Sequence, residues 1–111
     1  MIKTAQFFKC LSDDTRLHAT LLILLEGELC VCELTQALNE SQPKISRHLA
    51  QLRNCSILDD TKRGHWVYYS IAKTLPKWAL DVLNTTSQSD LKSLKIFQKN
   101  LKAMKNRPTC C

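Results

Sequence analysis

Two helical patterns separated by a three-residue turn constrain the fold of this chain more than any other feature. The first pattern is short, from about Val31 to Leu38, and the turn is Asn39-Glu40-Ser41. The second pattern runs to Asn54. It has Ser41 as a good N-cap residue and Pro43 in the first turn, where the missing N–H costs nothing. A short helix, a tight turn and a proline-started helix are typical of a helix-turn-helix unit.

The remaining segments add further helices and one hairpin. They are, in chain order, a helix at 2–11, a helix at 14–25 closed by Gly27, extended runs at 57–62 and 65–71 joined at Arg63-Gly64, a helix after Pro76, a polar break at 85–89, and a last helix at 91–104. The two extended runs are rich in Val, Ile, Thr, Trp and Tyr and predict a β-hairpin. This order predicts a mainly α (α+β) fold, a winged helix-turn-helix.

Size and charge limit the class of protein. A chain of 111 residues can bury one core and not two, so we expect one domain at 1–106 and a Cys-containing tail at 107–111. No run of about 18 apolar residues is present to span a membrane. The first ten residues lack a signal-peptide pattern, so a cytoplasmic protein is expected. The net charge of +6 favours a polyanionic partner, although a solvated basic surface also explains it.

The helix from Ser41 to Asn54 is predicted to bind in the major groove of DNA. Ile45, Leu49 and Leu52 recur at helical spacing and form a packing stripe, which leaves a polar face for DNA. The alternative is an amphipathic surface helix with a solvated basic face, and the hairpin with its basic tip favours DNA over it. The predicted contacts are Ser41, Gln42, Lys44, Ser46, Arg47, His48 and Gln51 on the helix, and Lys62 and Arg63 at the hairpin tip.

Six cysteines, several of them clustered, suggest soft-metal or redox chemistry. In a reducing cytosol they are expected to be thiols, and pairs of thiolates select soft ions. We expect Cys30 and Cys32 to bind such an ion at the start of the short helix, whose N-terminus lowers thiol pKa values. Residues i and i+2 point to opposite sides of a regular helix, so binding should distort its first turn.

The other cysteines are less constrained. Cys110 and Cys111 either supply further ligands, if the tail folds back, or form an exposed pair without a role. Cys10 and Cys55 are expected to be isolated core or interface thiols, with a second site between subunits as the alternative. The last helix carries an apolar stripe that one small domain cannot easily cover, which suggests a dimer interface. Its members are Leu91, Leu94, Phe97, Leu101 and Met104.

Three runs resemble the ArsR/SmtB family of metal-sensing repressors, and within it the arsenic-responsive members. They are Glu28-Leu29-Cys30-Val31-Cys32-Glu33-Leu34, Ser41-Gln42-Pro43-Lys44-Ile45-Ser46-Arg47-His48-Leu49 and Gly64-His65-Trp66-Val67-Tyr68-Tyr69. The resemblance covers Phe7 to about Leu83. It implies a homodimer formed by the first and last helices, binding to an inverted repeat in operator DNA, and release when arsenite or antimonite binds cysteine thiolates. No organic cofactor is expected.

One position departs from that pattern. Arsenic-responsive members often carry a third cysteine where this chain has Thr35, so a third ligand would come from the tail, a small thiol or solvent. The helix after Asp90 contains no histidine, which argues against a zinc sensor with ligands there. The alternatives are a cadmium- or lead-responsive repressor and a redox-responsive one in which oxidation of Cys30 and Cys32 replaces metal. Further alternatives are an architectural DNA binder and a thiol reductase; no nucleophile–base set supports an enzyme.

Overall fold

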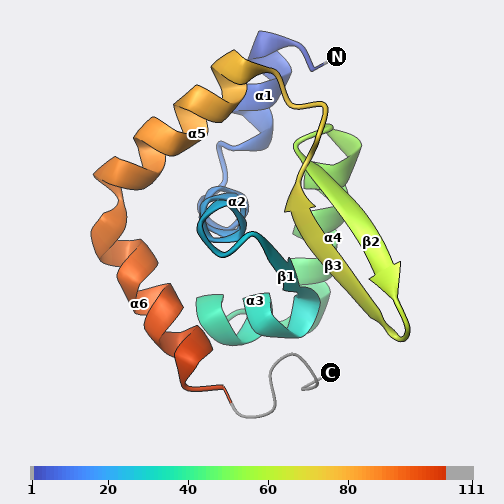
Figure 1. Cartoon of the computed structure of the whole chain (residues 1–111), viewed down its shortest axis with the longest axis vertical. Coiled ribbons are helices and arrows are strands. Elements are labelled where there is room, and N and C mark those ends of the chain that lie inside the picture. The colour runs from blue at the N-terminus through green and yellow to red at the C-terminus, as the bar shows by residue number, and fades with distance from the viewer. Residues whose placement is uncertain (1, 105–111) are drawn as a thin grey trace.

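The molecule is built around one central helix. The computed structural model describes residues 2–104, so the tail at 107–111 with Cys110 and Cys111 lies outside the described residues, and the domain bounds stay a prediction. The elements are α1 (Thr4–Cys10), α2 (Asp14–Glu26), β1 (Glu28–Cys30), α3 (Val31–Leu38), α4 (Gln42–Asn54), β2 (Leu58–Arg63), β3 (Trp66–Ile71), α5 (Lys77–Ser89) and α6 (Leu91–Lys102). The other five helices form a ring around α2, which is seen end-on, and the hairpin projects to one side (Figure 1).

Helix α2 begins and ends where the local chemistry directs. The side chain of Asp13 accepts a hydrogen bond from the backbone N–H of Arg16 at 3.0 Å, which satisfies a donor at the start of the helix. The helix ends before Gly27, whose φ is +92°. A residue with a side chain would be strained at this angle, whereas glycine adopts it readily. Three consecutive residues, Leu21, Leu22 and Ile23, are fully buried, which shows that the middle of the helix is covered on all sides.

A three-residue strand adds to the sheet and was not predicted from the sequence. Strand β1 pairs antiparallel with β3, which gives the order β1-β3-β2. Leu29 lies opposite Tyr69 and Cys30 opposite Tyr68. A strand of three residues is too short to show a recognisable alternation of apolar and polar side chains in the sequence. Cys30 therefore ends this strand and is also the N-cap residue of α3, so the prediction that it lies at the start of the short helix is confirmed.

Strands β2 and β3 form the predicted hairpin, which we call the wing (residues 58–71). Their register runs from Leu58 opposite Ile71 to Arg63 opposite Trp66. Arg63 thus belongs to the strand, and the turn begins at Gly64, whose φ is +62°. Within the wing, β3 packs one face on the core, as its alternation of side chains predicts.

Helix α5 continues through the segment where a polar break was expected. The hydroxyl of Thr86 donates to the carbonyl oxygen of Val82 at 2.6 Å, and the hydroxyls of Ser87 and Ser89 donate to carbonyl oxygens three residues earlier. These polar side chains are satisfied by the helix itself and need no loop. The predicted break is wrong for this reason.

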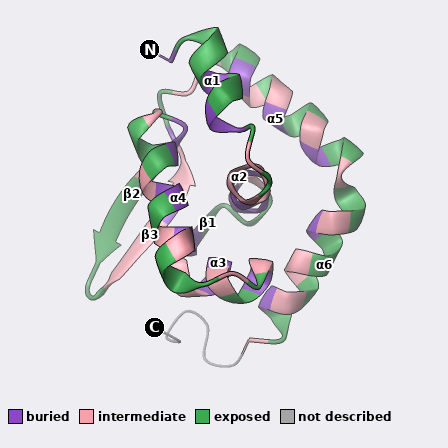
Figure 2. Ribbon diagram, turned by 180° about the vertical axis from the view of Figure 1, so that it is seen from behind, coloured by how far each residue is buried: buried purple, intermediate pink, exposed green. Residues whose placement is uncertain are grey.

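The apolar stripe of the last helix is partly covered within the chain. Leu94 and Leu101 are buried in the core that α6 shares with α2 and α3. Among residues 2–104, the large apolar side chains left exposed are Phe8, Leu25, Trp78, Leu91 and Ile96. Exposed residues recur along the outer sides of α5 and α6 (Figure 2). No helix within residues 2–104 is long and apolar enough to cross a membrane.

Candidate functional site: the DNA-facing helix and the thiol pair

Helix α4 forms as its sequence predicts. The hydroxyl of Ser41 caps it by accepting a hydrogen bond from the backbone N–H of Lys44, and Pro43 lies in the first turn. The predicted packing stripe is confirmed, because Ile45, Leu49 and Leu52 are at most 1% exposed. The helix therefore presents one side to the core and the opposite side to solvent.

The outer side of α4 and the wing carry the candidate DNA contacts. The side-chain amide of Gln42 donates to the hydroxyl of Ser46 at 2.8 Å, and Lys44 forms an ion pair with Glu40. Arg47 and Lys62 are exposed, and within residues 2–104 they make no hydrogen bond or ion pair through their side chains. These two cations can approach DNA without breaking a contact inside the protein.

His48 does not lie on the DNA-facing side. It is 8% exposed, and its Nδ1 lies 3.2 Å from Nη1 of Arg16 and 3.3 Å from Oε1 of Gln51. Its Nε2 lies 3.8 Å from a carboxylate oxygen of Asp13. His48 follows Ile45 by three residues, which places it on the packing stripe. The prediction of His48 as a DNA contact is therefore wrong.

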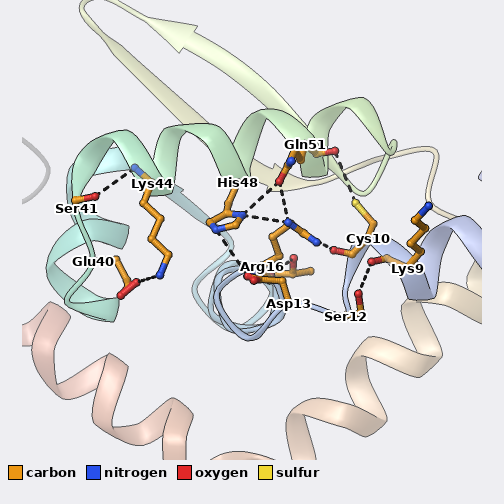
Figure 3. A network of polar contacts seen from close by, with 11 residues as sticks. Lys9, Cys10, Ser12, Asp13, Arg16, Glu40, Ser41, Lys44, His48 and Gln51 are labelled. Carbon is orange, nitrogen blue, oxygen red and sulfur yellow. Dashed lines mark hydrogen bonds and ion pairs between the residues drawn. The ribbon is translucent and has the colours of Figure 1, made fainter.

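Arg16 of α2 connects three helices at this point. Its Nε donates to the carbonyl oxygen of Cys10 at 2.6 Å, and its Nη1 donates to Oε1 of Gln51 at 2.8 Å. Figure 3 shows the guanidinium between α1 and α4, with His48 beside it. Gln51 is exposed, but Arg16 holds its oxygen, so its NH₂ group is the part left for DNA. Arg16 was not predicted as a functional residue from the sequence, although an arginine close to the N-cap of an otherwise apolar helix was a signal for it.

The two basic residues predicted at the wing tip differ in their surroundings. Arg63 forms an ion pair with Glu28, and its guanidinium carbon lies 4.0 Å from the centroid of the Tyr68 ring. Arg63 would have to leave Glu28 to contact a phosphate. Lys62 has no such contact within the described part of the chain, so it is the better candidate for DNA.

Cys30 joins β1 to α3 and caps the helix. Its backbone N–H donates to Oε1 of Glu33 at 3.0 Å, while its side chain accepts from the backbone N–H of Glu33. This reciprocal capping box explains why the carboxylate of Glu33 is buried, at 4% exposed. Cys30 is a buried free thiol at 1% exposed, whereas the half-buried Cys32 is part of a disulfide.

Burial raises the pKa of the Cys30 thiol above its ordinary value of 9.0. The backbone N–H of Glu33 lowers this pKa, and the Glu33 carboxylate raises it. The prediction that a helix N-terminus lowers the pKa of this thiol is wrong, because loss of solvent outweighs the helix contribution. Cys30 is therefore protonated at neutral pH.

One cavity brings the thiol pair next to the DNA-binding elements. It has a volume of about 450 Å³ and is lined by Cys30, Val31, Cys32, Gln42, His65, Trp66 and Val67. Within residues 2–104 no group of three or more His, Cys, Asp or Glu side chains is arranged to hold a metal ion. The hydroxyl of Thr35, at the position where a third cysteine was considered, donates to the carbonyl oxygen of Cys32 at 2.8 Å, which is a hydrogen bond within α3. Once the disulfide of Cys32 is reduced, the described residues thus offer two sulfur ligands beside the first turn of α4.

Cys10 and Cys55 are not isolated thiols. They form a disulfide within the chain, with their Cα atoms 6.7 Å apart. The prediction of separate core or interface thiols is wrong, and so is the alternative of a site between subunits, because the ring of helices brings the two residues together.

These features define a class of protein. A helix-turn-helix with one exposed face, followed by a β-hairpin, is a winged helix-turn-helix DNA-binding domain. The family model "Bacterial regulatory protein, arsR family" matches residues 13–60. The chain is 51% identical over 115 residues to the arsenic resistance transcriptional regulator ArsR2 of Pseudomonas putida, covering 100% of both. The chain belongs to the arsR family of transcription regulators.

Two further relatives agree with this assignment. The arsenical resistance operon repressor of Escherichia coli K12 is 45% identical over 96 residues, which cover 86% of this chain and 82% of that protein. The crystal structure of the AntR antimony-specific transcriptional repressor superposes with a TM-score of 0.65 at 25% identity, covering 86% of this chain and 88% of that one.

Proposed function

We infer that this protein is a transcriptional repressor that responds to trivalent arsenic or antimony. It binds an inverted repeat in operator DNA as a homodimer, through the outer face of α4 and the wing. Arsenite or antimonite binds the reduced protein through the sulfur atoms of Cys30 and Cys32, which become thiolate ligands on binding, and thereby releases the DNA. Relatives named for arsenic and antimony support this choice of effector.

The cavity shared by the two thiols, Gln42 and the wing carries the proposal. An effector bound to Cys30 and Cys32 lies against the first turn of α4 on one side and against β3 on the other. A ligand can shift an equilibrium between conformers only if it binds one of them better. Here the favoured conformer is one in which α4 and the wing have moved to accommodate the bound atom. Two recognition helices displaced in this way no longer fit successive major grooves.

The donor set suits a trivalent metalloid. Sulfur ligands select soft ions, and each As–S bond forms when a thiol condenses with a hydroxyl of As(OH)₃ and releases water. Cys30 is protonated at neutral pH, so it supplies both the sulfur and the proton that leaves as water. Cys110 and Cys111, which lie outside the described residues, are candidates for a third sulfur.

The dimer is proposed on the exposed apolar residues. Phe8 on α1 and Trp78 on α5 have ring centroids 6.4 Å apart and form one exposed aromatic patch. Ile96 on α6 is 55% exposed. These side chains place exposed apolar surface on the first and last helices, α1 and α6, and on α5 beside α1, where a second copy would cover it.

The effector is tested by fluorescence anisotropy of the reduced protein on a duplex selected by the protein from random sequence. We expect arsenite and antimonite to raise the dissociation constant of DNA, and zinc to leave it unchanged. The variants Cys30→Ser and Cys32→Ser should bind DNA and ignore arsenite. The matched control is the Cys10→Ser/Cys55→Ser variant, which should keep the response. Release of the Cys30→Ser protein by arsenite would overturn the assignment, and release by cadmium alone would favour a cadmium sensor.

Two further variants test the third sulfur ligand and the dimer interface. If the tail supplies a third sulfur, Cys110→Ser/Cys111→Ser protein will bind arsenite more weakly; unchanged binding would leave solvent as the third ligand. Ile96→Glu protein should sediment as a monomer and lose DNA affinity while keeping its helix content. A dimer that persists in this variant would contradict the proposed use of α6.

A further inference from the structure

The disulfide between Cys10 and Cys55 joins the last residue of α1 to the residue that follows α4. Neither sulfur belongs to the thiol pair at Cys30 and Cys32, and neither lines its cavity. The bond therefore fixes one end of the DNA-facing helix to α1 by a route that does not involve the proposed effector.

The bond is accessible to small molecules. Cys10 and Cys55 line a surface pocket of about 310 Å³, together with Gln6, Lys9, Arg16 and Gln51. Cys55 is half-buried and open to this pocket. A disulfide buried for stability alone would be closed to oxidants and reductants. Lys9 and Arg16 bring positive charge to the pocket, which favours a thiolate, the reactive form of cysteine.

The surroundings accommodate both redox states. The sulfur of Cys10 lies 3.7 Å from the carbonyl oxygen of Gln51, so the reduced thiol can donate a hydrogen bond there (Figure 3). Arg16 holds the carbonyl oxygen of Cys10 and the side chain of Gln51 whichever state the sulfur is in. Reduction thus removes the covalent link without leaving a buried polar group unsatisfied.

We propose that Cys10 and Cys55 form a reversible redox site through which hydroperoxides regulate DNA binding, independently of the metalloid site. The thiolate of Cys55 attacks the peroxide, the O–O bond breaks, and a sulfenic acid and hydroxide form; the hydroxide takes up the proton that the thiol released and becomes water. The thiol of Cys10 then attacks the sulfenic sulfur and expels a second water. In total two thiols are oxidised to a disulfide and one hydrogen peroxide is reduced to two waters. Cellular thiols reverse the reaction by exchange.

Oxidation strengthens DNA binding in this proposal. In the reduced protein, α4 is held to α1 by Arg16 and by weak contacts of Cys10. DNA binding must then order that end of α4, which costs conformational entropy. A covalent link orders it beforehand and so removes part of this entropic cost. The disulfide also holds α4 in the arrangement in which Arg47 faces outward.

The test uses a background variant in which the other four cysteines are serine, so that Cys10 and Cys55 are the remaining thiols. Hydrogen peroxide should form one intrachain disulfide, seen as a linked peptide carrying both residues and reversed by dithiothreitol. The oxidised protein should bind the selected duplex about three- to tenfold more tightly than the reduced protein. The matched control, Cys10→Ser in the same background, should show no change in affinity with peroxide.

A linked peptide without a gain in affinity, or weaker binding on oxidation, would overturn the proposal, as would failure of the disulfide to form. If the background variant does not fold, hydrogen exchange on the native sequence takes its place. Backbone amides at 51–56 should exchange more slowly in the oxidised protein, and equal exchange would contradict the proposal. Because the background lacks Cys30 and Cys32, its result does not depend on whether the metalloid proposal holds.

Discussion

Arg16 on α2 and Gln51 on α4 are joined by a hydrogen bond of 2.8 Å from Nη1 to Oε1. The same guanidinium binds the carbonyl oxygen of Cys10, so one side chain sets the position of α4 relative to both α1 and α2. A planar guanidinium can serve several acceptors at fixed angles, whereas an ammonium group cannot.

The first prediction concerns Arg16→Lys. We expect the free energy of unfolding to fall by about 1–3 kcal/mol, because hydrogen bonds from a charged donor are lost, and DNA affinity to fall with it. Urea denaturation and anisotropy measure the two effects. The matched control is Arg53→Lys. Arg53 forms an exposed ion pair with Asp60, so its replacement should cost less than about 1 kcal/mol. Equal losses for the two variants would show that Arg16 has no special role.

The second prediction concerns the two exposed cations. Arg47→Ala should lower affinity by about 1–3 kcal/mol and relax sequence preference, as expected for a base contact. Lys62→Ala should weaken binding to all sequences and reduce the salt dependence of log K by about one ion, as expected for a phosphate contact. Lys92→Ala on α6 removes the same charge far from α4 and serves as the control. A uniform loss for Arg47→Ala would make it a phosphate contact instead.

The third prediction separates arsenite from a divalent metal by proton balance. Condensation of As(OH)₃ with protonated thiols releases water and no net proton, so the dissociation constant of arsenite should change little between about pH 6 and 8. Cadmium displaces one proton from each thiol, so its dissociation constant should fall about tenfold per pH unit for each thiol deprotonated. Calorimetry in buffers of different ionisation enthalpy counts the protons. Proton uptake on arsenite binding would mean that Cys30 is already a thiolate, because a thiolate displaces hydroxide from As(OH)₃, and this would go against the direction of its pKa.

The fourth prediction concerns the rate of metalloid capture. The carboxylate of Glu33 raises the pKa of Cys30, and its oxygen also caps the backbone of that residue. Glu33→Gln removes the charge and keeps an oxygen acceptor. We therefore expect a lower pKa for the Cys30 thiol, a larger thiolate fraction and faster arsenite association in stopped-flow measurements. Glu40→Gln, in the turn before α4, should leave the rate unchanged. A slower reaction in Glu33→Gln would indicate that the cap, not the charge, governs access to the thiol.

The fifth prediction concerns Asp13, which caps α2. Asp13→Ala should lower the free energy of unfolding by about 1 kcal/mol. The backbone N–H of Arg16 lowers the pKa of Asp13 below 3.8, with a smaller contribution from His48. Because the folded-state pKa is the lower one, the carboxylate stabilises the protein above the unfolded pKa and loses this effect as the pH falls through the folded one. Asp13→Asn keeps the cap, so its stability should vary less with pH below about pH 4.

The sequence predicted the elements whose signals are local. Helix α4 was identified because Ser41, Pro43 and the stripe at Ile45, Leu49 and Leu52 all lie within one segment and agree. The hairpin was identified for the same reason, apart from the position of Arg63. Local signals also suggested the thiol pair, since Cys30 and Cys32 are two residues apart.

The features that were missed depend on contacts between distant segments. Strand β1 is too short for a pattern and exists because Leu29 and Cys30 pair with β3. His48 has the residue type of a DNA contact, and its burial follows from Arg16 on another helix. The disulfide joins residues separated by 45 positions, and no spacing rule links them. The pKa of Cys30 was misjudged because its burial outweighs the contribution of the helix end.

The pairing of Cys30 with Tyr68 has a consequence for how such regulators diversify. The backbone of Cys30, the sulfur ligand that we propose, also pairs with the strand that supports the wing. In this proposal, effector specificity and DNA specificity are therefore not separate modules. Moving the Cys30-Val31-Cys32 segment into another scaffold would transfer the sulfur ligands without the strand pairing that couples effector binding to the wing. A working graft would have to carry β1, α3 and β3 together, and in natural descendants we expect a change of ligands at this strand to be accompanied by compensating changes in the wing.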